Sequence, residues 1–182
     1  MTKLEDNPTP LPPGIERPGT IGGEWFVAHA KPRMEKALAW DLVARGVAYY
    51  LPLVRRTYMS GGRRRTVLTP LFPSYVFIAG TPEDRLTALQ TKRIVHVLPV
   101  PQQKQLASEL NAIHAALSAN IDLDVYPHVA VGRRVRVSRG PMRGVEGIVV
   151  RDENVARIVL QVTMIGSGAS LEINAADLEE SV

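Results

Sequence analysis

The chain contains few residues of the kinds that usually carry chemistry. Histidine is the commonest general acid, base and metal ligand, and there are four histidines, none of them spaced as in a metal-ligand motif: His29, His96, His114 and His128. There is no cysteine, which excludes a disulfide framework and a thiolate metal site. Asp152-Glu153-Asn154 could in principle hold a cation, but the run is better explained as a hairpin turn.

Signatures of catalysis are missing as well. The sequence has no Gly-x-Ser-x-Gly element, no phosphate-binding loop and no paired-carboxylate arrangement. We therefore expect no catalytic residues, no metal and no cofactor. An α+β enzyme of another kind stays open as an alternative, but it would need a cluster of polar residues that the sequence does not display.

Among the charged and polar residues, arginine is concentrated in two segments of the chain. Between Leu42 and Pro82 there is no acidic residue but six arginines: Arg45, Arg55, Arg56, Arg63, Arg64 and Arg65. A second group precedes Glu146: Arg133, Arg134, Arg136, Arg139 and Arg143. Segregated positive charge is typical of proteins that lie close to nucleic acid, and a merely solvated basic face is the alternative. Three phenylalanines and five tyrosines are too few to make a base-stacking platform the obvious interpretation.

The elements that must position these arginines are predicted to begin after residue 23. Residues 1–23 are rich in proline and glycine and are predicted to form a mobile tail. Residues 24–29 have the aromatic and β-branched residues of a strand. A helix is predicted from Pro32, with Met34, Leu38 and Leu42 as its apolar stripe, and Gly46 supplies its stop. Within the expected strand 48–53, Pro52 indicates an edge position.

Residues 54–69 are predicted to form a basic hairpin with its turn at residues 60–62. Further elements are expected in the order strand 74–78, helix 82–91, strand 94–100 and helix 102–119. Leu86 and Leu89 should face inward from the first of these helices. This order predicts an α+β domain, residues 24–119, with an antiparallel sheet flanked by helices.

The pattern changes in the last third of the chain. Residues 120–130 resemble a linker, and beyond them apolar residues alternate, as in Ile158, Leu160 and Val162. Several short strands separated by glycines predict a small SH3-like β-barrel over residues 131–182. No segment approaches the roughly 18 apolar residues that a membrane span needs, and the N-terminus lacks the apolar stretch of a signal peptide. We therefore expect a monomeric cytoplasmic protein without a membrane partner.

Two stretches resemble a known family. Residues 132–150, which include Gly140-Pro-Met-Arg-Gly144 and Gly147, are similar to a KOW motif. Residues 25–29 with the following helix, and residues 70–78 (Pro-Leu-Phe-Pro-Ser-Tyr-Val-Phe-Ile), resemble the N-terminal (NGN) domain of NusG-type transcription elongation factors. A KOW motif alone also occurs in ribosomal proteins, so a ribosome-associated or RNA-binding KOW protein remains the alternative.

The resemblance implies contacts with RNA polymerase. The pair Tyr75 and Phe77 would line a partly exposed apolar pocket for the clamp region, with His29 beside it on the neighbouring strand. From the residues alone, both aromatics are better explained as part of the core. Arg63, Arg64 and Arg65 would lie near non-template or upstream DNA. Ile165 would offer the barrel's contact for Rho or a small-subunit ribosomal protein, while Met164, in phase with the strand before it, is expected in the core.

Within the family, residues 70–77 are more similar to specialised paralogues of the RfaH kind. Those paralogues carry a His-Thr-Thr element that touches polymerase, and here only Thr87 is retained from it. The C-terminal domain of RfaH can also form a helical hairpin. Six glycines between Gly132 and Gly168 oppose a helix in this chain, and a permanent barrel is predicted from about Val131 to Leu178.

Overall fold

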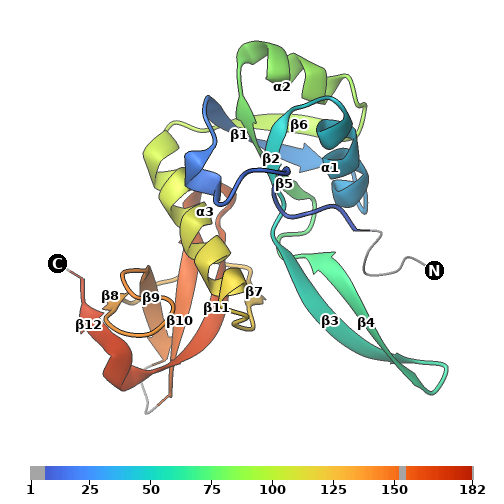
Figure 1. Cartoon of the computed structure of the whole chain (residues 1–182). Helices are drawn as coiled ribbons and strands as arrows, with labels where there is room; N and C mark the ends of the chain where they lie inside the picture. Colours follow the sequence, from blue (N-terminus) through green and yellow to red (C-terminus); the bar gives the residue numbers. More distant parts are fainter. Residues whose placement is uncertain (1–6, 152–154, 182) are drawn as a thin grey trace. The chain divides into compact units, whose positions relative to one another are not determined.

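The computed structural model describes residues 7–151 and 155–181. The chain divides into two compact units, residues up to Gln103 and residues from Lys104 onward (Figure 1). The first contains an antiparallel sheet with helices and the second is rich in strands, as the sequence predicts. The turn predicted at Asp152–Asn154 lies outside the described residues.

The first unit is built on a four-stranded antiparallel sheet whose strand order is β2-β5-β1-β6. Its strands are β1 (Glu24–Ala30), β2 (Ala48–Tyr50), β5 (Tyr75–Gly80) and β6 (Ile94–Pro99). The short strand β2 forms one edge, as Pro52 indicates. Two further strands, β3 (Leu53–Ser60) and β4 (Arg63–Pro70), form a separate two-stranded sheet.

Helices α1 (Glu35–Ala44) and α2 (Pro82–Leu89) pack on one face of the four-stranded sheet. Their buried residues join one core with alternate residues of the strands: Phe26, Ala28, Ala30, Leu38, Ala39, Leu42, Tyr49, Val76, Ile78 and Ala88. Helix α1 starts three residues later than predicted because Arg33 has a left-handed backbone, φ 64°, which an L-residue does not adopt inside a helix. It is followed by Gly46 at φ 69°, which confirms the predicted stop.

The prediction for the inward face of α2 is wrong. Leu86 is 59% exposed and Leu89 is 38% exposed, whereas Ala88 is fully buried. A capping box fixes the first turn: the Thr81 hydroxyl accepts from the Asp84 N–H, and the Asp84 carboxylate accepts from the Thr81 N–H. The start of the helix thereby orients its small residue, Ala88, toward the sheet.

The other face of the sheet is covered too. Trp25 and Phe26 point to opposite faces, yet both are buried, at 5% and 6% exposed. Tyr50 and Phe77 face each other across β2 and β5 and are both fully buried. The Gln103 side chain donates to the Trp25 carbonyl (2.8 Å) and accepts from the Trp25 N–H (2.6 Å).

Residues 7–23 are ordered, unlike the mobile tail predicted from their composition. The Leu51 N–H donates to the carbonyl of Pro10 (2.9 Å), and the Tyr49 hydroxyl donates to the carbonyl of Thr9 (2.8 Å). Leu11 is buried. Proline has no N–H to satisfy, so this segment can cover the edge beyond β2 by accepting hydrogen bonds. A short 3₁₀ turn, η2 (Pro18–Thr20), leads to β1.

The second unit contains a six-stranded antiparallel sheet in the order β12-β8-β9-β10-β11-β7. The strands are β7 (Asp124–Tyr126), β8 (Arg133–Val137), β9 (Glu146–Arg151), β10 (Val155–Val162), β11 (Ser167–Asn174) and β12 (Leu178–Glu180), with 3₁₀ turns η3 (Thr163–Ile165) and η4 (Ala175–Asp177). Strands occupy the region from Arg133 onward, so this unit is rich in strands, as the sequence predicts. That the barrel is permanent stays a prediction. Helix α3 (Gln103–Ser118), where the two units meet in sequence, buries Leu106, Leu110, Ile113 and Ala116.

Two details of this unit differ from the expectations. Residues 120–130 are not a simple linker, because β7 pairs with β11 from Gly168↔Tyr126 to Ser170↔Asp124. Met164 is only half-buried rather than part of the core, since η3 interrupts the strand alternation that ends at Val162. The alternation itself is confirmed at Ile158, Leu160 and Val162, which are all buried.

Close packing of β10 against β11 requires glycine at position 168. An added Cβ there would lie 2.7 Å from both the Leu160 carbonyl oxygen and the Val159 Cγ1. We expect Gly168→Ala to lower the free energy of unfolding by about 1–3 kcal/mol, measured by urea denaturation followed by circular dichroism. Gly22→Ala is the matched control, because no heavy atom lies within 4 Å of its added Cβ. Equal unfolding midpoints for both variants would contradict this packing.

Burial also predicts how stability depends on high pH. Burial raises the pKa of the Tyr50 phenol far above its ordinary value, and that of Tyr49 to a lesser degree. The unfolded chain releases these protons near pH 10 while the folded chain keeps them. The stabilisation is therefore complete below pH 10 and declines above it, by about 1.4 kcal/mol per pH unit for Tyr50. Tyr50→Phe should reduce that slope by about one tyrosine's share in urea titrations between pH 9 and 12; an unchanged slope would contradict the assignment.

Candidate functional site

One row of side chains crosses the sheet from β5 to β6. His29 of β1 is paired with Tyr75 of β5 on one side and with His96 of β6 on the other. The His29 and Tyr75 rings meet edge to face with centroids 5.3 Å apart, and the His29 and His96 rings stack at 4.7 Å. His96 is exposed, and Tyr75 and His29 are half-buried. This row, His96–His29–Tyr75, is an aromatic strip that a partner can reach from the His96 end.

The central residue of the row, His29, has a polar ring atom that makes no hydrogen bond within the described residues. The Nδ1 atom of His29 is buried and has no hydrogen-bond partner among the described residues. A buried nitrogen of this kind costs free energy, so the row combines apolar ring surface with an unused hydrogen-bonding group.

Phe77 does not line the partly exposed pocket that the resemblance implies. It is fully buried and packs edge to face against Phe72, with centroids 6.2 Å apart. Alternation puts Phe77 on the same face of β5 as Tyr75, but two residues further into the covered part of the sheet. Removing a buried phenylalanine typically costs about 3–5 kcal/mol of stability, so replacing it would test folding rather than a surface contact.

The turn before Tyr75 is held by Glu35, a residue that no pattern in the sequence identifies. Glu35 is 6% exposed, and its Oε1 accepts from the Ser74 N–H at 2.6 Å. Ser74 has a left-handed backbone, φ 66°, and its carbonyl accepts from the Ala30 N–H (2.8 Å). The first residue of α1 therefore fixes where β5 begins, and with it the position of Tyr75.

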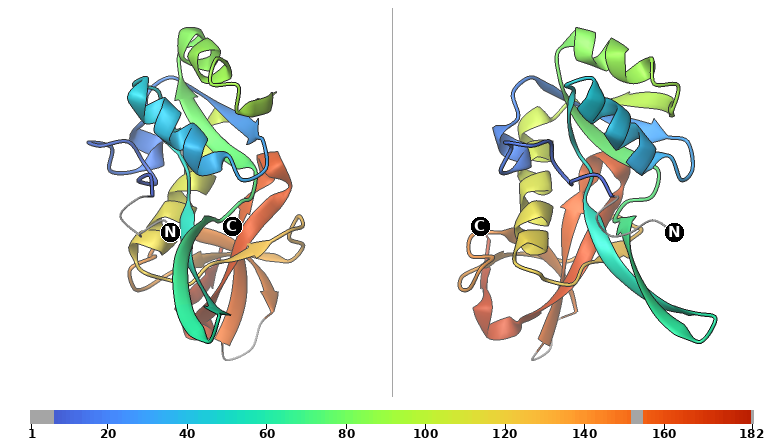
Figure 2. Two further views of the ribbon diagram at one scale, coloured as in Figure 1. Left: turned by 90° about the vertical axis from the view of Figure 1, so that its right-hand side faces the viewer. Right: turned by 45° about the vertical axis from the view of Figure 1, so that its right-hand side comes forward.

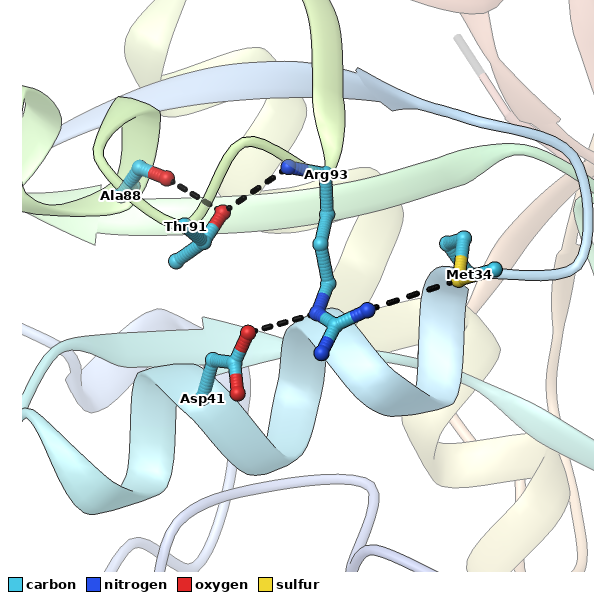
Figure 3. Close-up of polar contacts among 5 residues, drawn as sticks. All are labelled: Met34, Asp41, Ala88, Thr91 and Arg93. Carbon is cyan, nitrogen blue, oxygen red and sulfur yellow. Dashed lines mark hydrogen bonds and ion pairs between the residues drawn. The ribbon is translucent and has the colours of Figure 1, made fainter.

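Thr87 lies half-buried on α2. A polar cluster joins the end of this helix and the segment after it to α1 (Figure 3). The Arg93 Nε donates to Asp41 Oδ2 at 2.6 Å, and its Nη1 contacts the Met34 sulfur at 3.5 Å. The Thr91 hydroxyl donates to the Ala88 carbonyl (2.7 Å) and accepts from the Arg93 N–H (3.3 Å). These contacts join α1 to the segment that follows α2, and so fix the helix that carries Thr87.

The three arginines predicted to meet nucleic acid lie at the start of β4, directly after the turn Gly61-Gly62. Both glycines have positive φ, 58° and 73°, as a two-residue hairpin turn requires. Arg63 and Arg64 are exposed and Arg65 is half-buried. The hairpin extends as an arm from the four-stranded sheet in every view (Figure 2).

The second arginine group differs from the first because the fold brings acids to it. Arg136 pairs with Glu146 (2.6 Å) and Arg133 with Glu180 (3.1 Å). Hydrogen bonds from Arg136 and Ser181 lower the pKa of the Glu146 carboxyl. Further along, Arg151 and Arg157 share Glu172. The positive charge that the sequence concentrates here is therefore partly neutralised on the folded surface.

Ile165 lies half-buried in η3. Thr163, two residues before it, is anchored to α3. Glu109 accepts from the Thr163 hydroxyl at 2.6 Å and from its N–H at 3.1 Å, and Gln105 donates to both Glu109 and Thr163. Among the described residues, no group of three or more His, Cys, Asp or Glu side chains could hold a metal ion. Nor is any helix in the described ranges long and apolar enough to cross a membrane.

The Glu35 contact generates a direct test. Glu35→Ala leaves the Ser74 N–H without its acceptor and should cost about 1–3 kcal/mol of unfolding free energy. Glu35→Gln keeps an oxygen acceptor at the same place and should retain most of that stability. Amide hydrogen exchange should be faster at Ser74 in the alanine variant than in the glutamine variant. Equal exchange in both variants would mean that the carboxylate does not hold the turn.

The family model described as "Transcription termination factor nusG" matches residues 23–113, which is half of the 182-residue chain. Among curated proteins, no match was found. A solved structure of NusG from Thermotoga maritima, described as showing its domain interaction, is 15% identical with a TM-score of 0.49, covering 87% of this chain and 97% of that one.

A second solved structure, the MjSpt4:Spt5 complex in conformation B, is 13% identical with a TM-score of 0.28, covering 86% of this chain and 95% of that one. The residues that the family model matches contain the whole sheet, the basic hairpin and the His96–His29–Tyr75 row. The chain belongs to the NusG family.

Proposed function

We propose that this protein binds RNA polymerase through its first unit and modulates pausing and termination or antitermination. Membership of the NusG family supports a role in transcription elongation generally. The observation that carries the finer proposal is the His96–His29–Tyr75 row, an aromatic strip inside the family-matched residues. Aromatic residues that enter a partner's surface supply much of the energy of most protein interfaces.

In this proposal, each candidate residue has a different part. Tyr75 and His29 contact the polymerase clamp region directly, and Phe77 supports them from within the core. Thr87, on α2, contacts a second part of polymerase. The exposed leucines Leu86 and Leu89 on the same helix would add apolar area to that second contact.

The mechanism has no chemical step. A factor that binds the closed clamp more tightly than the open one shifts the equilibrium toward the closed, elongating state, by as much as the two affinities differ. The second unit, joined to the first by the chain, is then held at high effective concentration near another partner. We propose that Ile165 contributes to that contact, with Rho or a small-subunit ribosomal protein as the partner.

A specialised role of the RfaH kind is also part of the proposal, on the resemblance of residues 70–77. The competing function, an RNA-binding KOW protein that acts without polymerase, is less well supported. Its basic group would have to bind RNA, yet Arg133 and Arg136 already pair with glutamates. Co-purification from cell extract separates the two: recovery of ribosomes without polymerase would favour the RNA-binding alternative.

Tyr75→Ala should weaken binding to core RNA polymerase by about thirtyfold, the loss expected for one aromatic anchor of about 2 kcal/mol. Affinity is measured by titrating labelled protein with core enzyme free of nucleic acid. Tyr58→Ala is the matched control, because Tyr58 is an equally large aromatic residue on the hairpin and is 48% exposed. Circular dichroism and urea denaturation verify that both variants fold. If folded Tyr75→Ala protein binds with the parent's affinity, the row is not the polymerase contact.

A further inference from the structure

Three exposed cations gather where β1 ends, beside the aromatic row. Lys31 follows His29 by two residues, and its N–H donates to the Arg93 carbonyl (2.8 Å). The pairing of β1 with the chain before β6 therefore continues past the end of the strand, and alternation keeps Lys31 on the same face as His29. Arg33 and Lys92 are carried by the two loops that this hydrogen bond joins. All three residues are exposed, and we call them the basic rim.

Two members of the basic rim occupy backbone positions where glycine is the usual residue. Arg33 is the third residue of a turn closed by a hydrogen bond from the Met34 N–H to the Lys31 carbonyl (3.0 Å), and its φ is 64°. Lys92 ends the segment after α2, where its N–H donates to the Leu89 carbonyl (3.1 Å), and its φ is 59°. A left-handed backbone strains any residue that has a Cβ atom, and such strain is concentrated at functional sites.

The charge of the basic rim is not paired off by the fold. Among the residues that the structure describes, none of its three members makes an ion pair. Both acids of α1 are engaged elsewhere. Glu35 is buried and accepts from the Ser74 N–H, while Asp41 pairs with Arg93 at 2.6 Å (Figure 3). The positive charge of the rim therefore remains for a partner.

Cations beside an aromatic row favour a protein partner that carries carboxylates. A protein surface that packs on Tyr75 and His29 brings its neighbouring side chains to the basic rim, whereas a partner held by phosphates alone would leave the row unused. The edge of an interface is typically polar, and opposite charges across it speed association and select the partner. The pairing of β6 with β1 also leaves an extra residue, Val95, which is 56% exposed and adds apolar surface next to His96.

We propose that the basic rim receives carboxylate side chains of RNA polymerase, beside the polymerase surface that packs on the His96–His29–Tyr75 row. Arg33 and Lys92 stand where glycine would be less strained, and their charge serves this contact. The inference deepens the proposed function and rests on it, since the partner is the polymerase that the row is proposed to bind. Replacing these two cations by glycine should therefore weaken binding without weakening the fold.

The main variant is Arg33→Gly with Lys92→Gly in the full chain. Its unfolding midpoint in urea should equal or exceed the parent's, because relief of the strained backbone offsets the greater freedom of glycine in the unfolded chain. Its affinity for core RNA polymerase free of nucleic acid should fall about fivefold at about 50 mM salt, the loss expected for two exposed ion pairs. That difference should nearly vanish at about 0.5 M salt, where exposed charges are screened.

Three further variants make the result specific. Arg33→Lys with Lys92→Arg keeps both charges and should retain the parent's affinity. Arg17→Ser with Arg45→Ser is the matched control, because it removes two exposed cations that lie before β1 and after α1, and it should bind polymerase almost as the parent does. Tyr75→Ala should lose affinity at every salt concentration, because its contact is apolar. Circular dichroism verifies that each variant folds.

The outcomes separate the basic rim from the row. If the glycine variant binds with the parent's affinity at low salt, or loses no more than the control pair, the rim proposal is overturned, and a loss in Tyr75→Ala leaves the polymerase contact standing. If Tyr75→Ala binds with the parent's affinity, the proposed function fails and the rim proposal fails with it. A glycine variant that binds core polymerase normally but labelled single-stranded DNA more weakly would assign the rim to phosphates and overturn the choice of partner.

Discussion

The central strand β1 imposes the main constraint on the first unit. It pairs with β5 on one side and β6 on the other, and its residues from Trp25 to Ala28 are buried on both faces. A backbone this enclosed must have its N–H and C=O groups paired along its length. Because the register is fixed in this way, His29 comes to lie between Tyr75 and His96 at the end of the strand where the cover becomes thinner.

Several contacts that stand outside the sheet maintain this arrangement. Glu35 ties α1 to the turn at Ser74, Arg93 ties α1 to the segment before β6, and Gln103 closes the opposite end of β1. Each joins segments that are far apart in sequence, and the Glu35 contact supports a backbone conformation that serine alone does not favour. The candidate polymerase contact is therefore positioned by polar groups, while the apolar core provides most of the stability.

The basic hairpin is held in place differently from the four-stranded sheet. Strands β3 and β4 form their own two-stranded sheet, and an isolated pair of strands is marginally stable by itself. Here its base is fixed by Lys36, whose Nζ donates to the Leu68 carbonyl and to the Asn7 side chain, both at 2.5 Å. Burial lowers the pKa of this lysine, although Glu35 beside it opposes the shift. An arm anchored at its base and solvated along its length can present charged side chains on both faces without disturbing the core.

Features that depend on neighbouring residues could be predicted from the sequence. The pair Gly61-Gly62, which allows positive φ, predicted the hairpin turn, and Gly46 predicted the end of α1. Alternating apolar residues predicted strands such as β10. The resemblance to NusG-type factors could be recognised in the sequence for the same reason, because it rests on short contiguous motifs. Other features depend on residues that are distant in sequence and are visible only in the folded chain. They are the stacking of His29 on His96, the burial of Phe77, the outward leucines of α2 and the glutamates that neutralise the second arginine group. Whether a side chain is buried or paired depends on which strand or helix packs against it in the folded protein. A pattern of neighbouring residues does not determine that packing.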